Sequence, residues 1–377
     1  MKTTVYLDHN ATTPARPEAI EAVVEALSLV GNASSVHREG RAARRIIEDA
    51  RSRVAALVGA GETDVVFTSG GTEANNLAIR GGSRMRVLVS AVEHLSVLEA
   101  KREVEIIPVD TDGIIDMEAL ERLLAKEDGL ALVSVMLANN ETGVIQPVQA
   151  IGEICRRYGA LLHTDAVQAA GKIPVQLTGL GVDLMTLSAH KIGGPMGVGA
   201  LIATPRAALT GVSFGGGQEK GLRPGTENLP AIAGFGKAAE IAADKVKSFA
   251  ALAWRRNDLE RRILEISPDA QIFGAGADRL PNTSCIAMPG VDSETQVMAL
   301  DLDGVSVSAG SACSSGKVAI SHVLEAMTPD LPETENAIRV SLGWTTEDAD
   351  IDRFVEAWSA LYGRLGAAEP KKLGRQV

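Results

Sequence analysis

The sequence has 377 residues, which predicts two domains because single hydrophobic cores stop growing near roughly 250 to 300 residues. A formal net charge of -11 without a long basic run argues against a general nucleic-acid or membrane-surface binder, and no apolar stretch approaches the roughly 20 residues that span a bilayer. The 3 cysteines lack CxxC spacing, so we expect a cytoplasmic protein with a small substrate and no disulfide framework, metal site, nucleic acid or membrane partner.

Short β-rich runs alternate with helical patterns from about residue 20 to residue 201. The runs are DVVFTS, RVLVS, VEIIPV, LALVSVML, ALLHTDA, DLMTLS and VGALIA. This alternation is typical of an α/β fold with a large, mostly parallel sheet covered by helices. Only a Gly/Pro turn separates the last two runs, and it is too short for a crossover helix. We therefore expect these two runs to form an antiparallel pair.

One long helical stretch, at about Leu229 to Glu265, follows and is expected to connect the large domain to a smaller one. The β-like runs SCIAMPG, VSVSAG and IRVSLG, with helical patterns between them, predict a small α+β domain. The extended N-terminal segment could pack back onto this domain. The predicted division is a large domain at 16–245 and a small α+β domain formed by 1–15 and 246–377.

The segment VVFTSGGTEANN is typical of a strand, a glycine turn and a helix start, with Thr72 near the N-cap. Unpaired N–H groups at such a helix end can bind phosphate. No lysine follows at the spacing of a P-loop, and GxGxxG is not matched, which weakens an ATPase or dehydrogenase interpretation. An ordinary capped helix remains an alternative for this segment.

An acid, an amide and a lysine follow neighbouring predicted strands. Asp165 and Gln168 stand in LLHTDAVQ, and Lys191 follows VDLMTLSA. Such a set can hold a pyridoxal phosphate (PLP) ring, with the lysine in a Schiff base and the carboxylate keeping the ring nitrogen protonated. Most lysines are solvated surface charges, but Ser188, His190 and a glycine-rich turn are an unusual setting for one. These residues predict carbanion chemistry on amino acids.

His94 and the NNETG turn are expected at the same edge of the sheet. His94 follows the run VLVSAVEH and should emerge at the carboxyl edge, where open α/β sheets bind ligands. There it could stack on a cofactor ring or transfer a proton. Asn140 and Glu141 leave the next strand at this edge. A histidine satisfied by backbone groups and a simple turn are the alternatives.

The cysteines stand in different settings. Cys155 in IGEICRRYG and Cys285 in NTSCIAM are expected to be buried packing residues. Cys313 lies in the Ser/Gly-rich SAGSACSSG, with nothing apolar for the thiol to pack against. We expect this thiol to be exposed and mobile, so that its thiolate could reach into an active site as a nucleophile.

Two further side chains could bind anionic groups. Arg339 lies in AIRVSLG, and its planar guanidinium suits a substrate carboxylate, with a surface ion pair as the alternative. Thr226 lies in the RPGTEN loop outside the predicted sheet and could contact a phosphate in this chain or in a partner subunit. The residues alone leave both assignments open.

A series of motifs resembles those of the cysteine desulfurases, the NifS/IscS-type branch of the fold-type I PLP enzymes in the class-V aminotransferase family. The motifs are YLDHNATTP, GNASSVH, TSGGTEANN, EH, NNETG, HTDAVQ, SAHKIGGPMG, GGGQEKGLRPGTEN, SAGSACSSG and IRVSLGWTT. They run from the N-terminus to about residue 350. The resemblance implies a large, mostly parallel seven-stranded sheet domain, a small α+β domain and a homodimer.

The resemblance also implies how PLP is held. Lys191 would bind the cofactor covalently, Asp165 would pair with the pyridine nitrogen, and Gln168 with the ring hydroxyl. His94 would stack on the ring. The implied phosphate ligands are Gly71, Thr72, Ser188, His190 and, from the other subunit of a homodimer, Thr226.

The implied reaction converts L-cysteine to L-alanine. Asn140 would contact the cofactor and the substrate, Arg339 would bind the substrate carboxylate, and the freed Lys191 would take up the Cα proton. The Cys313 thiolate would attack the substrate sulfur, with His94 as a proton carrier, and the persulfide would pass to an acceptor in iron-sulfur cluster assembly or tRNA thiolation. The alternatives are a selenocysteine lyase, another PLP-dependent aminotransferase or lyase, and a non-enzymatic sulfur carrier.

The chain departs from the family pattern at three positions. Met196 stands where GPKG is common, Ala33 where GNPSS is common, and His9 where other residues occur. None has a named role, but Met196 removes a charge near Lys191. The SACSSG segment resembles the longer-loop subgroup that hands sulfur to scaffold proteins.

Overall fold

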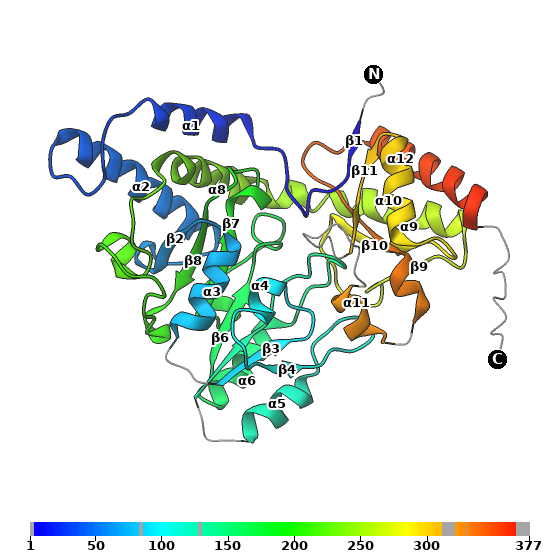
Figure 1. Cartoon of the computed structure of the whole chain (residues 1–377), viewed down its shortest axis with the longest axis horizontal. Helices are drawn as coiled ribbons and strands as arrows, with labels where there is room; N and C mark the ends of the chain where they lie inside the picture. The colour runs from blue at the N-terminus through cyan, green and yellow to red at the C-terminus, as the bar shows by residue number, and fades with distance from the viewer. Residues whose placement is uncertain (1–3, 83–85, 127–129, 311–320, 330, 367–377) are drawn as a thin grey trace.

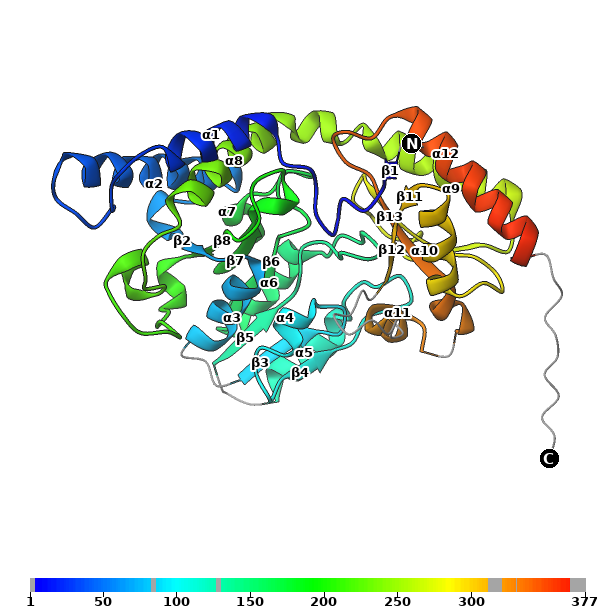
Figure 2. The same ribbon diagram turned by 45° about the horizontal axis from the view of Figure 1, so that its top comes forward.

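The structure, a computed structural model, describes residues 4–82, 86–126, 130–310, 321–329 and 331–366. Two groups of elements lie side by side, a larger region around a seven-stranded sheet and a smaller region around a four-stranded sheet (Figure 1, Figure 2). None of the helices in these ranges has both the length and the apolar character needed to cross a lipid bilayer.

The larger sheet has the strand order β2-β8-β7-β6-β5-β3-β4. Its strands are β2 (Val65–Thr68), β3 (Arg86–Ser90), β4 (Glu105–Ile107), β5 (Ala131–Ser134), β6 (Leu161–Asp165), β7 (Leu184–Ser188) and β8 (Gly199–Ala203). Of these described strands, only β8 runs antiparallel to its neighbours, β7 and β2. The predicted mostly parallel sheet and the antiparallel pairing of its last two strands are therefore confirmed.

Alternate residues of these strands face two layers of helices, so both faces of the sheet are buried. Val65 and Phe67 of β2, for example, lie in one hydrophobic core and Val66 in the other. The first core is covered by α1 (Pro17–Leu27), α2 (Arg38–Leu57), α5 (Met117–Ala125), α6 (Val148–Arg157), α7 (Leu177–Leu180) and α8 (Leu229–Phe249). The second core is covered by α3 (Gly71–Gly81) and α4 (Leu95–Leu98).

The smaller region contains an antiparallel sheet in the order β12-β13-β10-β9. Its strands are β9 (Gln271–Ile272), β10 (Thr283–Ala287), β12 (Ser308–Ala309) and β13 (Ala337–Ser341). The helices of this region are α9 (Leu252–Ile266), α10 (Ser293–Leu302), α11 (His322–Met327) and α12 (Asp348–Leu361). A separate hydrophobic core that includes Phe354 and Trp358 joins β9, β10, β13, α9, α10 and α12, as expected for an α+β unit, whereas α11 packs in a further cluster with Val92 and Phe273.

The N-terminal segment packs onto the smaller region, as predicted (Figure 1). Strand β1 (Val5–Tyr6) pairs in parallel with β11 (Val305–Ser306), and Leu7 is fully buried in the smaller core. The chain then crosses to the larger region, where the N–H of Arg16 donates to the carbonyl of Gly193. The boundaries at residues 15 and 245 stay a prediction, because α8 runs across the second of them.

The stretch from Leu229 to about residue 265 is helical, as predicted, but it is not one continuous helix. The segment forms α8 and α9, separated at Ala250 and Ala251. Both alanines keep helix-like dihedral angles, but i→i+3 hydrogen bonds tighten the turn there. The two helices bury their apolar faces in different cores, which requires a change of direction that sequence periodicity does not encode.

Candidate active site

A cavity of about 490 Å³ lies at the carboxyl edge of the larger sheet. The smaller region closes one side of it with Arg339 and His322. This is the edge at which open α/β sheets bind ligands. The predicted site residues that line the cavity are Gly71, Thr72, His94, Asn140, Asp165, Gln168, Ser188, His190, Lys191 and Arg339.

Two predicted residues are not placed in this cavity. Thr226 is exposed in the loop before α8 and does not line the cavity, so its contact with a phosphate in a partner subunit stays a prediction. Cys313 lies outside the described residues. Gly310 and His322, which are described, both line the cavity.

Lys191 ends a short 3₁₀ turn (Ala189–Lys191) that follows directly after β7. Its Nζ donates to the main-chain carbonyl oxygens of Asn10, at 2.6 Å, and Ala11, at 2.7 Å. Burial, together with the positive charge of Arg339, lowers the pKa of Lys191 to about 8. A larger share of this amine is therefore unprotonated near neutral pH than of an ordinary lysine, as a nucleophilic amine requires.

Asp165 is the last residue of β6, and its carboxylate is held by two uncharged donors. Its Oδ2 accepts from Asn75 Nδ2 at 2.7 Å, and its Oδ1 accepts from the N–H of Val167 at 2.9 Å. These bonds fix the carboxylate in the wall of the cavity without placing a cation on it. Such a carboxylate suits a protonated ring nitrogen.

The other end of the cavity has the features of an anion site. Gly71 and Thr72 begin α3, where free N–H groups and the helix dipole favour negative charge. A Cβ atom at Gly71 would lie 3.1 Å from Val167 Cγ2, so glycine allows a close approach there. Burial, followed by the charge of Lys191, lowers the pKa of His190 to about 4, which leaves a neutral ring that can donate one hydrogen bond.

His94 caps the first turn of α4 with its side chain. Its Nδ1 accepts from the N–H of Ser96 at 3.1 Å and lies 2.8 Å from Ser96 Oγ. Because Nδ1 accepts from this N–H, a neutral His94 ring carries its proton on Nε2. His94 thus has a cap role and also lines the cavity, and its stacking on a cofactor ring stays a prediction.

Arg339 lies on β13 and is only 6% exposed, so the alternative of a surface ion pair is wrong. Its Nη2 pairs with Asp8 Oδ1 at 2.8 Å, and its Nη1 donates to the Asn140 carbonyl at 3.2 Å. Its Nε is buried and has no hydrogen-bond partner among the described residues. A buried guanidinium with an unused donor at the cavity wall suits a substrate carboxylate.

Sequence reasoning missed several residues that the fold brings to this site. Asn75 holds Asp165, Asn10 accepts from Lys191, and His322 donates from Nε2 to the Glu93 carbonyl at 2.9 Å. Asn75 and Asn10 stand in the motifs TSGGTEANN and YLDHNATTP, whereas His322 stands in none of the motifs. No spacing rule, however, links them to partners that are distant in sequence.

The remaining predictions concern packing residues. Cys155 and Cys285 are buried as expected, and burial raises the pKa of both thiols, that of Cys155 to about 12.

Met196, which stands where the family pattern often has a lysine, is 69% exposed and does not line the cavity, so this difference in charge lies outside the site. His9 is buried with Nδ1 2.7 Å from Thr13 Oγ1, and Ala33 packs on the first core.

Comparison with known proteins places the chain in a family. The model of the class-V aminotransferases matches residues 5–354. A cysteine desulfurase of Cereibacter sphaeroides is 44% identical over 381 residues, covering 97% of this chain and 97% of that protein. Cysteine desulfurase IscS of Dictyoglomus turgidum is 39% identical, covering 99% and 98%. The X-ray structure of a NifS-like protein from Rickettsia africae matches with a TM-score of 0.89 at 38% identity, covering 96% of this chain and 99% of that one. The chain therefore belongs to the class-V aminotransferase family and, within it, to the cysteine desulfurases.

Proposed function

We propose that the protein is a PLP-dependent desulfurase that moves the sulfur of L-cysteine onto Cys313 and then to an acceptor protein. The observation that carries the proposal is the meeting of three groups in one cavity. These are the amine of Lys191, the carboxylate of Asp165 and the guanidinium of Arg339. Family membership supports the same substrate class.

The donor set of the cavity fits PLP at three points. Lys191 supplies an amine of low pKa for the aldehyde, Asp165 supplies a fixed negative charge for the ring nitrogen, and the start of α3 suits the phosphate. Within the part of the chain that the structure describes, the buried Oδ1 of Asn75 has no hydrogen-bond partner, which leaves a hydrogen-bond acceptor available beside Asp165. Bound PLP would withdraw electrons from the Cα atom of an attached amino acid.

Three side chains of the cavity bind the substrate and transfer protons. Arg339 binds the carboxylate of cysteine and orients its Cα–H bond. Lys191 Nζ, once displaced from the cofactor, takes the proton from Cα and can return one later. His94, with its proton on Nε2, supplies a second proton at the open side of the cavity.

Cys313 receives the sulfur. Its thiolate attacks the sulfur of the bound cysteine, so that an S–S bond forms as the Cβ–S bond breaks, and the electron pair of that bond is protonated at Cβ. L-cysteine and the Cys313 thiol thus become L-alanine and a Cys313 persulfide, with atoms and electrons balanced. An acceptor protein of iron-sulfur assembly or of tRNA thiolation then takes the outer sulfur.

The proposal extends to the assembly and its location. In the proposed homodimer, Thr226 of one subunit contacts the phosphate end of the cavity in the other subunit. Thr226 is exposed and does not line the cavity of its own chain, which supports this proposal. We place the protein in the cytoplasm, where a persulfide and its acceptors meet in a reducing environment.

The test compares the wild type with Cys313→Ser and Lys191→Ala. We expect the wild type to show a visible PLP band and to convert L-cysteine to equimolar alanine and transferable sulfur. Cys313→Ser should keep the band and lose more than about 100-fold of this turnover, whereas Lys191→Ala should lose the covalent band. Cys155→Ser, which changes a buried thiol on α6 that does not line the cavity, is the matched control and should keep turnover within about twofold.

Three outcomes separate the alternatives. Turnover with selenocysteine alone would identify a selenocysteine lyase. Amino transfer without sulfur release would identify an aminotransferase. A protein that never acquires a PLP band but carries sulfur would be a non-enzymatic carrier, and the proposal would then be wrong.

A further inference from the structure

Lys172 is a buried lysine that the reaction described above does not use. It is 4% exposed, and its Nζ donates to Asn10 Oδ1 at 2.7 Å and to Gln168 Oε1 at 2.8 Å. Burial, with the nearby charges of Lys191 and Arg339, holds the pKa of Lys172 far below its usual value. A buried amine bound by amide oxygens is costly, and an apolar side chain of similar volume would fill the space without that cost.

The partners of Lys172 are amides of the active site, and the hydrogen bonds determine which way each amide faces. The Asn10 main-chain carbonyl can only accept, so Gln168 must place Nε2 on it, at 2.9 Å, and turn Oε1 to Lys172. Asn10 Nδ2 donates to the Asn140 carbonyl, which can only accept, at 3.2 Å and to Thr283 Oγ1 at 2.9 Å. Asn10 Oδ1 therefore faces Lys172, and it also accepts from Asn282 Nδ2 at 3.1 Å. Lys172 therefore holds the acceptor ends of two amides that both line the cavity.

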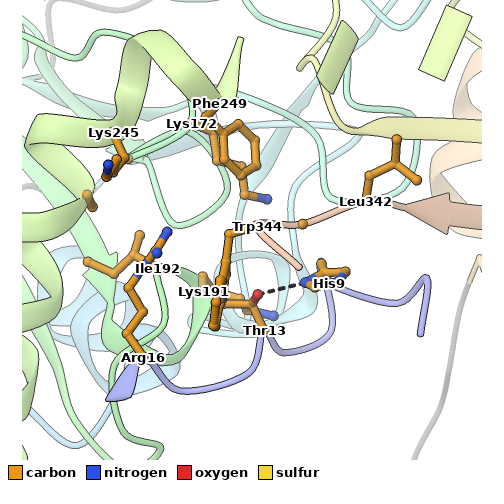
Figure 3. Close-up of a pocket in the computed structure, with 13 residues that line it drawn as sticks. His9, Thr13, Arg16, Lys172, Lys191, Ile192, Lys245, Phe249, Leu342 and Trp344 are labelled. Carbon is orange, nitrogen blue, oxygen red and sulfur yellow. Dashed lines mark hydrogen bonds between the residues drawn. The ribbon is translucent and has the colours of Figure 1, made fainter. Parts of the chain in front are cut away.

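The same network reaches the reactive amine. The Asn10 carbonyl that accepts from Gln168 also accepts from Lys191 Nζ at 2.6 Å. Lys172 and Lys191 both line a smaller cavity of about 30 Å³, in which their labelled side chains are seen together (Figure 3). Lys245 lines this smaller cavity as well, but its side chain is exposed on α8.

We infer that Lys172 is a positioning residue that, together with the Asn10 carbonyl, holds the Gln168 amide in the direction the cofactor needs and steadies the side chain of Asn10, whose main-chain carbonyl accepts from Lys191. Of the two hydrogens on Gln168 Nε2, one is used by the Asn10 carbonyl and the second is left for the ring hydroxyl oxygen of PLP. Without Lys172 the Asn10 carbonyl alone would hold the Gln168 amide in this direction, because Oε1 would lose its Lys172 donor. The inference rests on the proposed PLP site.

The test measures the dissociation constant of PLP from the holoenzyme, through loss of the visible band on dilution. Lys172→Met should weaken PLP binding by about 10-fold or more, as expected for one hydrogen bond to a charged group. In a Gln168→Ala background the same change should cause less than about a twofold further loss, because Lys172 acts through Gln168. Lys245→Met is the matched control and should bind PLP as the wild type does.

A second variant covers the case in which Lys172→Met does not fold. Gln168→Glu keeps an oxygen for Lys172 but lacks the NH₂ group, so it should also weaken PLP binding by about 10-fold or more. Wild-type affinity in Gln168→Glu, or fully additive losses in the double variant, would show that Lys172 is only a packing residue. If the wild type itself binds no PLP, the proposed function fails. If the wild type and Lys172→Met bind it equally, only this inference fails.

Discussion

The two walls of the active-site cavity are built from different ranges of sequence. On the sheet side, Asp165 and Lys191 stand at strand ends, and Asp165 is fixed partly by the N–H two residues further along. On the facing side, Arg339 depends on Asp8, 331 residues away in the chain. The wall that contains Asp165 and Lys191, called the cofactor wall below, is thus set largely by local structure. The wall that contains Arg339, called the substrate wall below, forms only after segments from both ends of the sequence have packed together.

The largest effect is expected on the cofactor wall, from Asp165→Asn. This change keeps the size of the side chain but removes the negative charge, so kcat should fall by about 100-fold or more. The fold should persist, because the Asn75 amide can turn its unpartnered Oδ1 to the new NH₂ group. Steady-state alanine formation, with the PLP content of each preparation, checks this. A kcat near that of the wild type would contradict the assigned role of Asp165.

A smaller effect is expected on the substrate wall, from Arg339→Met. Loss of the guanidinium should raise KM for cysteine by about 10- to 100-fold and, because Asp8 loses its partner, should lower the free energy of unfolding by about 2 kcal/mol. Kinetics and thermal unfolding measure the two effects separately. The double variant Asp8→Asn, Arg339→Met should recover much of the stability but not KM. Recovery of both would place substrate binding elsewhere.

The smallest effect tests whether the two walls influence each other. Only the unprotonated amine attacks an aldehyde, so the rate of PLP capture by the cofactor-free protein should rise with pH through a midpoint at about 8. Arg339 lowers the pKa of Lys191, so Arg339→Met should move this midpoint to higher pH. Stopped-flow absorbance across the pH range measures it. An unchanged midpoint in Arg339→Met would mean that the walls are electrostatically independent.

The fold was largely predictable from the sequence because strands buried on both faces form short apolar runs. The strand ends then brought most candidate residues to one edge. The break between α8 and α9 was missed because Ala250 and Ala251 carry no breaking signal, and the change of direction comes from packing on two cores.

Tertiary contacts explain the site residues that were missed. Asn75 is 90 residues from Asp165, and Lys172 is 162 residues from Asn10. No periodicity connects such positions. Arg339 was selected for its chemistry, but its partner Asp8 was not, because their meeting depends on β13 lying beside the N-terminal segment.

The pairing of β1 with β11 has a consequence for biosynthesis. Val5 and Tyr6 are synthesised about 300 residues before their strand partners, Val305 and Ser306. The larger sheet can assemble earlier during translation, but the smaller core closes only after α12 has been made. A rigid fusion at the amino end would therefore obstruct a late folding event and, through Asp8, the binding of substrate.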